Sequence, residues 1–228
     1  MRLTSTGHDA GLTMVPTDRE QCQNAIRREY AHLAPEYDRR WSFYIEATTS
    51  ATLARLSSSP TARILDVGCG TGVLLQRLAQ NQPRATLTGI DPVPEMLTVA
   101  RRRVPLSIEL HEGWVEELPF ADSAFDLVIS CSMFHYVRQP VVALREIGRV
   151  LRPGGELVIT DWCNDYRTCR VCSLWLRLTG SSHVRAYGER ECRRLLGETG
   201  YSQAQIERYK INYLWGLMTA KAAKPARI

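Results

Sequence analysis

The sequence of 228 residues predicts one α/β domain with a doubly wound, mainly parallel sheet. The first observation is an alternation after residue 62, where short apolar segments are separated by longer segments with helical periodicity. The second is that the short segments are apolar at consecutive positions, as in strands that are covered on both faces. Right-handed crossovers between such strands put helices on both sides of the sheet.

A tail and two helices are predicted before the sheet. Residues 1–16 mix Gly, Thr, Ser and charged residues without periodicity, which indicates a flexible tail. Thr17 and Glu20 have the spacing of a capping box, so a first helix begins near residue 18. A second helical segment runs from about 38 to 56 and ends at the Ser57-Ser58-Ser59-Pro60 sequence.

The remaining elements follow in regular order up to residue 162. Strands are predicted at 64–67, 85–90, 106–110, 125–131 and 156–161, and helices at 72–81, 94–103 and 140–151, the last ending at Pro153-Gly154-Gly155. Residues 163–200, rich in Cys, Arg and aromatic residues, are predicted as a helical lid insertion, and segments at 203–211 and 214–221 close the domain. The predicted domain spans 17–222, with N-terminal helices at 17–60 and a basic tail at 223–228.

Composition and charge exclude several classes of protein. Apolar residues (44%) and charged residues (23%) are close to globular averages, and neither a membrane span nor a secretion signal is present, which predicts a cytoplasmic protein. The seven cysteines are an odd number, so we expect reduced thiols. Most of the net charge of +5 lies in residues 201–228, and no basic groove crosses the domain, so nucleic acid is not expected as a partner. The Arg101-Arg102-Arg103 cluster is interpreted as a complement to a helix dipole.

The first strand leads into a glycine loop, Asp66-Val67-Gly68-Cys69-Gly70-Thr71-Gly72. Glycines at alternate positions let a ligand approach the backbone and permit positive φ. The third glycine comes one residue too early for the dinucleotide fingerprint, and no Gly-Lys-Ser/Thr of a phosphate-binding loop follows. Asp66 at the mouth of the loop would repel a pyrophosphate, so the loop favours a cationic ligand without phosphate.

The second strand ends in Gly89-Ile90-Asp91-Pro92. An acid at this position can accept hydrogen bonds from both hydroxyls of an adenosine ribose. Asp66 and Asp91 would therefore surround one cofactor, and two carboxylates suit a sulfonium.

The sequence resembles the class I S-adenosylmethionine-dependent methyltransferases, in particular the small-molecule group related to the ubiquinone- and menaquinone-biosynthesis C-methyltransferases. The resemblance covers residues 30–160. It rests on six blocks: Ala34-Pro35-Glu36-Tyr37-Asp38, Ile64 to Gly72, Gly89 to Pro92 with Glu95-Met96-Leu97, Glu117-Leu118-Pro119-Phe120, Ser123 to Val128, and Leu151-Arg152-Pro153-Gly154-Gly155. It implies a seven-stranded, Rossmann-like methyltransferase fold.

The resemblance also implies a cofactor, S-adenosyl-L-methionine, with S-adenosyl-L-homocysteine as product. It implies contacts from Gly68, Cys69, Gly70, Ser130, Cys131 and Tyr37 to the methionine part, from Asp66 to its amino group, from Asp91 to the ribose, and from Pro92 and Met96 to the adenine. Gly72 is a further cofactor-binding candidate. Where the family usually has Gly-Asp-Ala-Glu, this chain has Gly113-Trp114-Val115-Glu116. Either Trp114 stacks on the purine, with Val115 beside it, or Glu116 or a backbone carbonyl takes over; alternatively, Trp114 packs under the helix at 94–103.

Three residues are candidates for a catalytic role. Methyl transfer from a sulfonium needs mainly proximity and in-line orientation, and a base helps only if the nucleophile arrives protonated. His135 and Asp161, expected at the carboxyl edge of the sheet, are the candidate bases, and Tyr37 is the third candidate. His135 matches a family position that is as often structural as catalytic.

The predicted lid would determine which acceptor is methylated. Its aromatic residues could enclose a flat apolar acceptor or an amine, or could be core residues; with those from either end they are Trp162, Tyr166, Trp175, Tyr187, Trp41, Phe43, Tyr44 and Trp215. Cys163, Cys169 and Cys172 could bind arsenite or zinc, or could face the core, and no metal site is predicted.

The sequence thus predicts a methyltransferase that acts on a small organic acceptor. The alternatives are a catalytically silent cofactor-binding protein and a thiol or metalloid methyltransferase that uses the three lid cysteines. A nucleic-acid methyltransferase is disfavoured because the fourth strand ends in Ser130-Cys131-Ser132-Met133, not in an Asn/Asp-Pro-Pro-aromatic block. A dehydrogenase is possible only if the glycine spacing, which differs from the dinucleotide fingerprint, is a misleading signal. The acceptor atom and the oligomeric state stay open.

Overall fold

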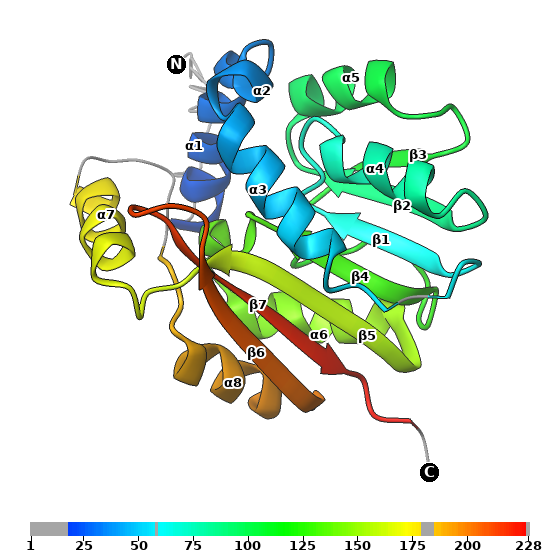
Figure 1. The fold of residues 1–228 in the computed structure, drawn as a ribbon. Coiled ribbons are helices and arrows are strands. Elements are labelled where there is room, and N and C mark those ends of the chain that lie inside the picture. The colour runs from blue at the N-terminus through cyan, green and yellow to red at the C-terminus, as the bar shows by residue number, and fades with distance from the viewer. Residues whose placement is uncertain (1–17, 58, 179–184, 227–228) are drawn as a thin grey trace, which may run out of the picture.

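A seven-stranded sheet forms the centre of the computed structural model, which describes residues 18–57, 59–178 and 185–226 (Figure 1). The strand order is β3-β2-β1-β4-β5-β7-β6. The strands are β1 (Arg63–Val67), β2 (Thr86–Asp91), β3 (Glu109–Glu112), β4 (Phe125–Cys131), β5 (Leu151–Trp162), β6 (Ser202–Lys210) and β7 (Gly216–Ala223). β7 runs antiparallel to both of its neighbours, β5 and β6, and the other strand pairs are parallel. The predicted, mainly parallel sheet is confirmed.

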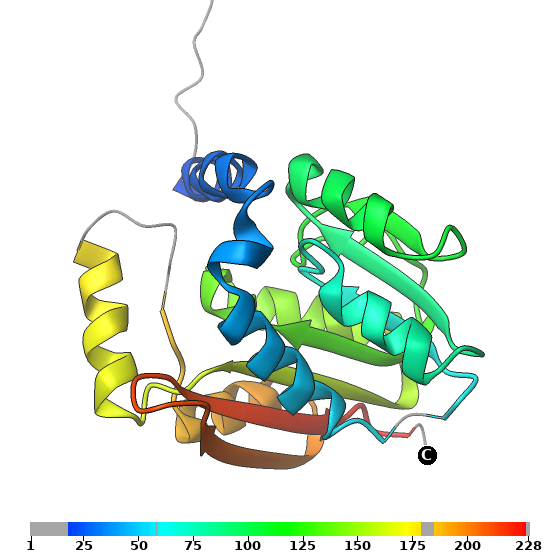
Figure 2. The ribbon, with the colours of Figure 1, turned by 45° about the horizontal axis from the view of Figure 1, so that its top comes forward.

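Helices cover both faces of the sheet, as the doubly wound prediction requires (Figures 1 and 2). On one face, α4 (Val73–Asn81) and α5 (Pro94–Arg103) bury leucines such as Leu75 and Leu97 against β1 and β4. On the other face, α6 (Pro140–Val150) and α8 (Glu189–Glu198) bury Leu144 and Leu195 against β4 and β5. No helix among the described residues is both long and apolar enough to cross a bilayer.

Three N-terminal helices lie over the carboxyl edge of the parallel strands: α1 (Asp18–Leu33), α2 (Tyr37–Arg40) and α3 (Ser42–Leu53). Helix α1 packs against α5, and α3 packs against α4 and β5. In Figure 2, α1 lies across the top of the molecule, and α2 and α3 descend from it along the sheet. The single helix predicted at 38–56 was wrong, because the backbone at Trp41 (φ −112°, ψ 18°) leaves the helical region and separates α2 from α3.

Two strand boundaries differ from the prediction by more than two residues. Strand β3 begins at Glu109 and not at 106, because Ile108 N–H bonds to Pro105 C=O in a turn that leaves Leu106 fully exposed. Strand β5 begins at Leu151 and contains the Pro153-Gly154-Gly155 sequence, which was expected to separate a helix from a strand. A register shift against β4 accommodates these residues, and Gly154 has a φ of +75°.

The segment predicted as a lid contains two helices with different surroundings. Helix α7 (Arg167–Leu178) lies beside the sheet, whereas α8 packs against β6 and β7 as part of the domain core. The sheet also extends past the predicted boundary at 222, since Lys224 exchanges backbone hydrogen bonds with Gly154 and Gly155. The predicted tail at 1–16, Thr17 of the capping box, residues 179–184 of the insertion and residues 227–228 lie outside the described residues.

Candidate functional site

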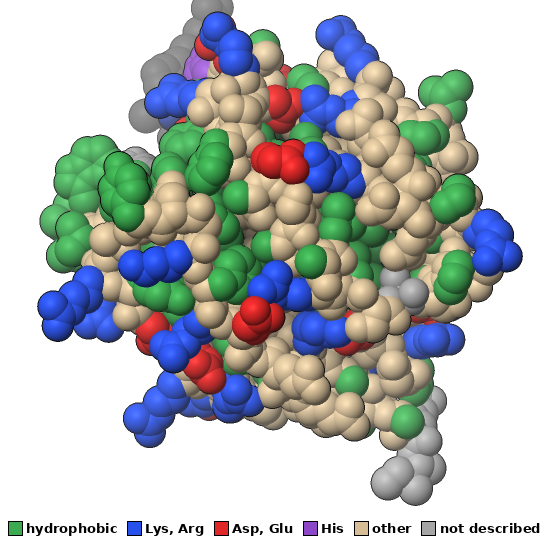
Figure 3. All heavy atoms as spheres, in the orientation of Figure 1, with side chains coloured by type: hydrophobic (Ala, Val, Ile, Leu, Met, Phe, Trp, Pro, Cys, Tyr) green, Lys and Arg blue, Asp and Glu red, His purple; other side chains and the backbone are tan. Residues whose placement is uncertain are grey.

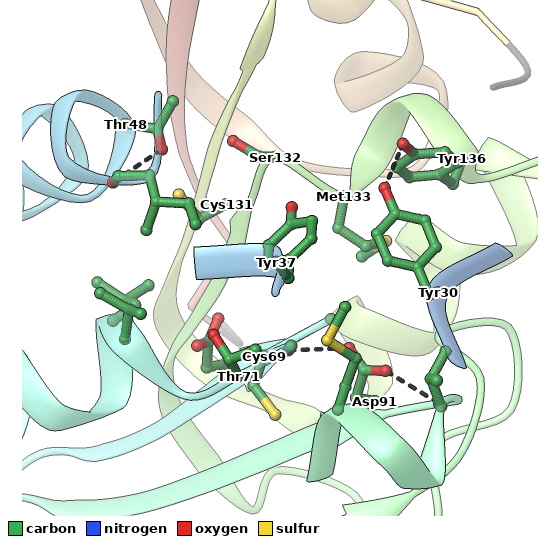
Figure 4. Close-up of a pocket in the computed structure, with 18 of the residues that line it drawn as sticks. Tyr30, Tyr37, Thr48, Cys69, Thr71, Asp91, Cys131, Ser132, Met133 and Tyr136 are labelled. Atoms are coloured by element: carbon green, nitrogen blue, oxygen red, sulfur yellow. Dashed lines mark hydrogen bonds between the residues drawn. The ribbon is translucent and has the colours of Figure 1, made fainter. Parts of the chain in front are cut away.

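A cavity of about 830 Å³ lies at the carboxyl ends of β1, β2 and β4, beneath the N-terminal helices (Figure 4). The strand order reverses between β1 and β4, and this reversal is where open α/β sheets bind ligands. The floor includes Asp66, Gly68, Cys69, Gly70, Thr71, Asp91, Pro92, Val93, Cys131, Ser132 and Met133; the roof includes Ile26, Tyr30, Tyr37, Tyr44, Ile45, Thr48 and Thr49.

The glycine loop forms one wall of the cavity in the conformation that glycine permits. Gly68 and Gly70 have φ values of +71° and +52°. A Cβ on Gly68 would come within 2.3 Å of Met133 Cγ, whereas one on Gly70 would meet no atom within 4 Å. Glycine is therefore needed at position 68 so that the loop can pack against the segment after β4. At position 70 the missing side chain leaves open space beside the loop.

Asp91 is fixed at the end of β2 by its own backbone surroundings. Its Oδ1 accepts from Val93 N–H and its Oδ2 from Gly70 N–H, each at 2.9 Å (Figure 4). Burial raises the pKa of Asp91 to about 6, although these two hydrogen bonds oppose the rise. Each carboxylate oxygen keeps a second lone pair, so Asp91 can still accept from the two hydroxyls of a ribose.

Asp66 is the second acid of the cavity and is 2% exposed. Its burial, together with the nearby charge of Asp91, raises the pKa of Asp66 to about 8. No basic side chain occurs among the described residues that line this cavity. A cation placed between the two acids would stabilise both carboxylates.

A second cavity of about 600 Å³ adjoins the first and shares Ile26, Gly68, Pro92, Met133 and Tyr136 with it. Its other walls include Cys22, Gln23, Val67, Gly113, Trp114, Val115, Glu116, Val137, Arg138 and Gln139. Trp114 also lies under the guanidinium of Arg27, 5.7 Å from its ring centroid, and packs in a cluster with Met96. Trp114 and Val115 are thus positioned beside the first cavity, on the side of Pro92.

Polar contacts hold the roof to the sheet. The hydroxyls of Tyr30 and Tyr136 face each other in a hydrogen bond that joins α1 to the segment after β4 (Figure 4). Asp38, next to Tyr37, accepts from Thr71 Oγ1 at 2.6 Å and pairs with Arg103 of α5. Arg103 also donates to Thr71 C=O at 2.9 Å, so a clasp of these three residues fixes α2 against the glycine loop. Arg103 therefore does more than complement a helix dipole.

Most of the predicted cofactor residues come together in this region. Tyr37, Asp66, Gly68, Cys69, Gly70, Asp91, Pro92, Met96 and Cys131 line the first cavity, and Trp114 and Val115 line the second. Gly72 lines neither, since it caps α4 and lets α5 approach, with Ala100 Cβ 3.1 Å from where its own Cβ would be. Ser130 is fully buried in β4 and also lines neither.

The two candidate bases lie outside both cavities. His135 Nδ1 is 2.7 Å from Asp161 Oδ1, and His135 N–H donates to Asp161 Oδ2 at 3.0 Å. His135 is 5% exposed and Asp161 is 2% exposed. Because neither residue reaches the cavity wall, their geometry is that of a buried structural pair, and the base role gains no support.

The described part of the predicted lid also lines neither cavity. Helix α7 turns Val171, Leu174, Trp175 and Leu178 outward, and Figure 3 shows these apolar side chains gathered on the surface over α7. Cys169 is buried and 3.2 Å from Gly216 C=O. The described residues include no group of three or more His, Cys, Asp or Glu residues able to hold a metal ion.

Sequence reasoning named Tyr37 and Tyr44 but missed the rest of the roof. Of the aromatic residues expected around the acceptor, Tyr44 alone lines the first cavity, together with Ile26, Tyr30, Ile45, Thr48 and Thr49 of α1 and α3. The helical spacing of Ile26 and Tyr30 marked the buried face of α1 and was the one available signal. Nothing in the spacing indicated that this face covers a cavity instead of core.

Comparisons with known proteins agree with this geometry. A family profile described as a methyltransferase domain matches residues 65–159. A demethylmenaquinone methyltransferase of Deinococcus radiodurans is 34% identical over 153 residues, which cover 64% of this chain and 63% of the relative. One from Chlorobaculum tepidum is 32% identical over 70% of this chain and 67% of the relative. The chain thus spans about two thirds of the length of these curated relatives.

The fold is also found in solved structures. A methyltransferase solved in complex with the Haloferax volcanii methyltransferase activator has a TM-score of 0.76 at 22% identity, over 86% of this chain and 98% of that one. The sheet, its glycine loop and the two acids at the ends of β1 and β2 define a Rossmann-like methyltransferase domain. The chain belongs to the class I S-adenosylmethionine-dependent methyltransferase family, in the small-molecule group related to the quinone-biosynthesis C-methyltransferases.

Proposed function

We propose that this protein transfers the methyl group of S-adenosylmethionine to a small aromatic acceptor of the quinol type. The observation that carries the proposal is the pair of buried acids, Asp66 and Asp91, beside a glycine loop in a cavity whose described lining has no basic side chain. This charge pattern suits a cationic cofactor without phosphate. The quinol type is supported by the relatives named demethylmenaquinone methyltransferase and by the aromatic and apolar roof.

The residues present fit the cofactor. Asp66 would accept from its ammonium group, and Asp91, which has lone pairs to spare, would accept from the ribose hydroxyls. Gly70 leaves open space for the methionine part, and the second cavity, with Trp114 and Val115, suits the adenine. When bound, the cofactor would supply a methyl group that its sulfonium has already activated.

Proximity is the proposed source of the rate. The titratable groups that line the cavity are carboxylic acids, tyrosines and cysteines, and burial raises the pKa of each, for example that of Cys131 to about 11. None of these tyrosines or cysteines is an effective base at neutral pH. The roof would exclude water and hold the acceptor in line with the methyl group.

The test is methyl transfer from labelled S-adenosylmethionine to 1,4-dihydroxynaphthalene, followed by mass spectrometry for a gain of one CH₂ unit. We expect product with the wild type and with Asp122→Ala, which removes an exposed carboxylate that lines neither cavity. We expect Asp91→Ala to lower the rate about a hundredfold, because two charge-assisted hydrogen bonds to the ribose are lost. If pools of quinols, phenols, amines and thiols all give no product while S-adenosylhomocysteine still binds, the silent cofactor-binding alternative replaces this proposal.

A further inference from the structure

Tyr44 of α3 lines the cavity and is not one of the residues expected to hold the cofactor. Its Oη accepts a hydrogen bond from Trp162 Nε1 at 2.7 Å. The indole N–H can only donate, so the phenolic oxygen is the acceptor in this pair. The hydrogen of Tyr44 is therefore directed to a different partner.

Burial keeps that hydrogen in place. The pKa of Tyr44 is raised well above its ordinary value, first by burial and then by the charge of Asp161. The hydroxyl therefore keeps its hydrogen at neutral pH and can donate it. Ser132 lines the same cavity, its Oγ is buried, and its hydroxyl interacts with that of Tyr44, which opposes the rise in the pKa of Tyr44. Its φ of +58° is unusual for a residue with a side chain and fixes the start of the segment after β4.

The donor to Tyr44 is itself held in place by the buried pair behind the cavity wall. The ring of Trp162 stacks on His135, with centroids 5.4 Å apart and an angle of 20° between the planes. Asp161 Oδ1 accepts from the backbone N–H of Trp162 at 2.7 Å and is also 2.7 Å from His135 Nδ1. His135 and Asp161 thus fix the indole that orients the Tyr44 hydroxyl.

We infer that Tyr44 and Ser132 form an oxygen-binding corner for the acceptor, with Tyr44 as the hydrogen-bond donor and with Trp162 and His135 as positioning residues. The inference rests on the proposed function and specifies its substrate class: aromatic or enolic molecules with an oxygen on or beside the carbon that is methylated. Amines and thiols lack the acceptor oxygen that this corner would bind.

The corner also defines a role in the transfer step. The nucleophilic atom of the acceptor forms a bond to the methyl carbon as the carbon–sulfur bond breaks, and the electron pair of that bond goes to sulfur, which becomes a neutral thioether. The proton that the acceptor atom carried leaves to water. A hydrogen bond from Tyr44 to the acceptor oxygen holds the ring in line with the methyl group during this step.

The test compares the binding of two probes to protein saturated with S-adenosylhomocysteine. The probes are 1,4-dihydroxynaphthalene and 1,4-diaminonaphthalene, measured by calorimetry. We expect Tyr44→Phe and Trp162→Phe to weaken binding of the dihydroxy probe about tenfold, the loss of one hydrogen bond, and to leave the diamino probe unchanged. The double variant should lose no more than Tyr44→Phe alone, because both changes act through one hydroxyl.

Tyr209→Phe is the matched control. Tyr209 lies on β6 and lines neither cavity, and its hydroxyl bonds to Thr219 Oγ1 of β7 at 2.8 Å. Equal losses for both probes, or the same loss in Tyr209→Phe, would overturn the inference. If Tyr44→Phe fails to fold, Trp162→Phe carries the same comparison. If no methyl is transferred but the preference for the dihydroxy probe is retained, the proposed function is refuted and the oxygen-binding corner is supported. If methyl is transferred without that preference, the proposed function is supported and the corner is refuted.

Discussion

Binding of S-adenosylhomocysteine should release about one proton at pH 6.5, and Asp66 should be its main source. In the free protein the pKa of Asp66 is about 8 and that of Asp91 is about 6, so at this pH Asp66 is almost fully protonated and Asp91 about one quarter protonated. The ligand's ammonium and ribose hydroxyls both favour the carboxylate form. The amino group of the ligand is already protonated at this pH, so it takes up almost none of the released protons.

The same linkage sets the pH dependence of affinity. Binding lowers the pKa of an acid that is raised in the free protein, so affinity falls as the pH drops below about 8. Between about pH 6.5 and 7.5 the dissociation constant should rise about tenfold for each unit of acidification, which is about 1.4 kcal/mol. Above pH 8 the affinity should level off.

Calorimetry in buffers of different ionisation enthalpy counts the protons directly. The slope of observed enthalpy against buffer enthalpy should give about one released proton for the wild type and for Asp122→Asn, whose carboxylate is exposed. Asp66→Asn should bind more weakly, release only the fraction that comes from Asp91, and lose most of the pH dependence. A slope of zero in the wild type, or an unchanged slope in Asp66→Asn, would refute the assignment of the ammonium to Asp66.

Three further outcomes follow from the same site. At pH 8 without ligand, Asp66→Asn should be more stable than the wild type by a free energy of unfolding on the order of a few kcal/mol, and should therefore melt at a higher temperature. The reason is that an acid whose pKa is raised in the folded state costs stability as the pH rises from about 4 to 8. Equal melting curves would contradict this. Arg103→Ala should speed dissociation of S-adenosylhomocysteine about tenfold in stopped-flow measurements by releasing the clasp on α2, with partial rescue by Arg103→Lys, while Arg102→Ala should behave as the wild type. Gly68→Ala should abolish ligand binding in calorimetry, because its Cβ would overlap Met133 and its φ of +71° would be strained; retained affinity would show that the loop is more adaptable than its packing indicates.

The floor of the site could be predicted from sequence because each part follows directly on a strand. The glycine loop after β1, Asp91 at the end of β2 and Cys131 at the end of β4 meet at one edge once the strands are parallel. Strand periodicity and local motifs therefore sufficed to locate them. Strand β4 and helix α5 were predicted with their observed boundaries for the same reason, since the signals at their ends are local.

Most of the roof could not be predicted, because it depends on how distant helices dock. Tyr44 reaches the cavity only because the chain bends at Trp41 and α3 then packs on α4, and no spacing in residues 38–56 indicated that bend. His135 and Asp161 were expected at the sheet edge and are there, but the direction of their side chains places them behind the wall. The exposed apolar face of α7 likewise depends on tertiary position, not on composition.

The division between floor and roof has a consequence for how such a protein can diversify. The matched family domain, residues 65–159, carries the glycine loop and both acids, whereas α1, α2 and α3 come from a stretch before it. Substitutions on α3, which carries Tyr44, can alter which molecule is accepted while the glycine loop and both acids stay unchanged. A graft of residues 18–53 between relatives is accordingly the natural unit for exchanging acceptor preference, with the clasp of Asp38, Thr71 and Arg103 as the junction that must be kept intact.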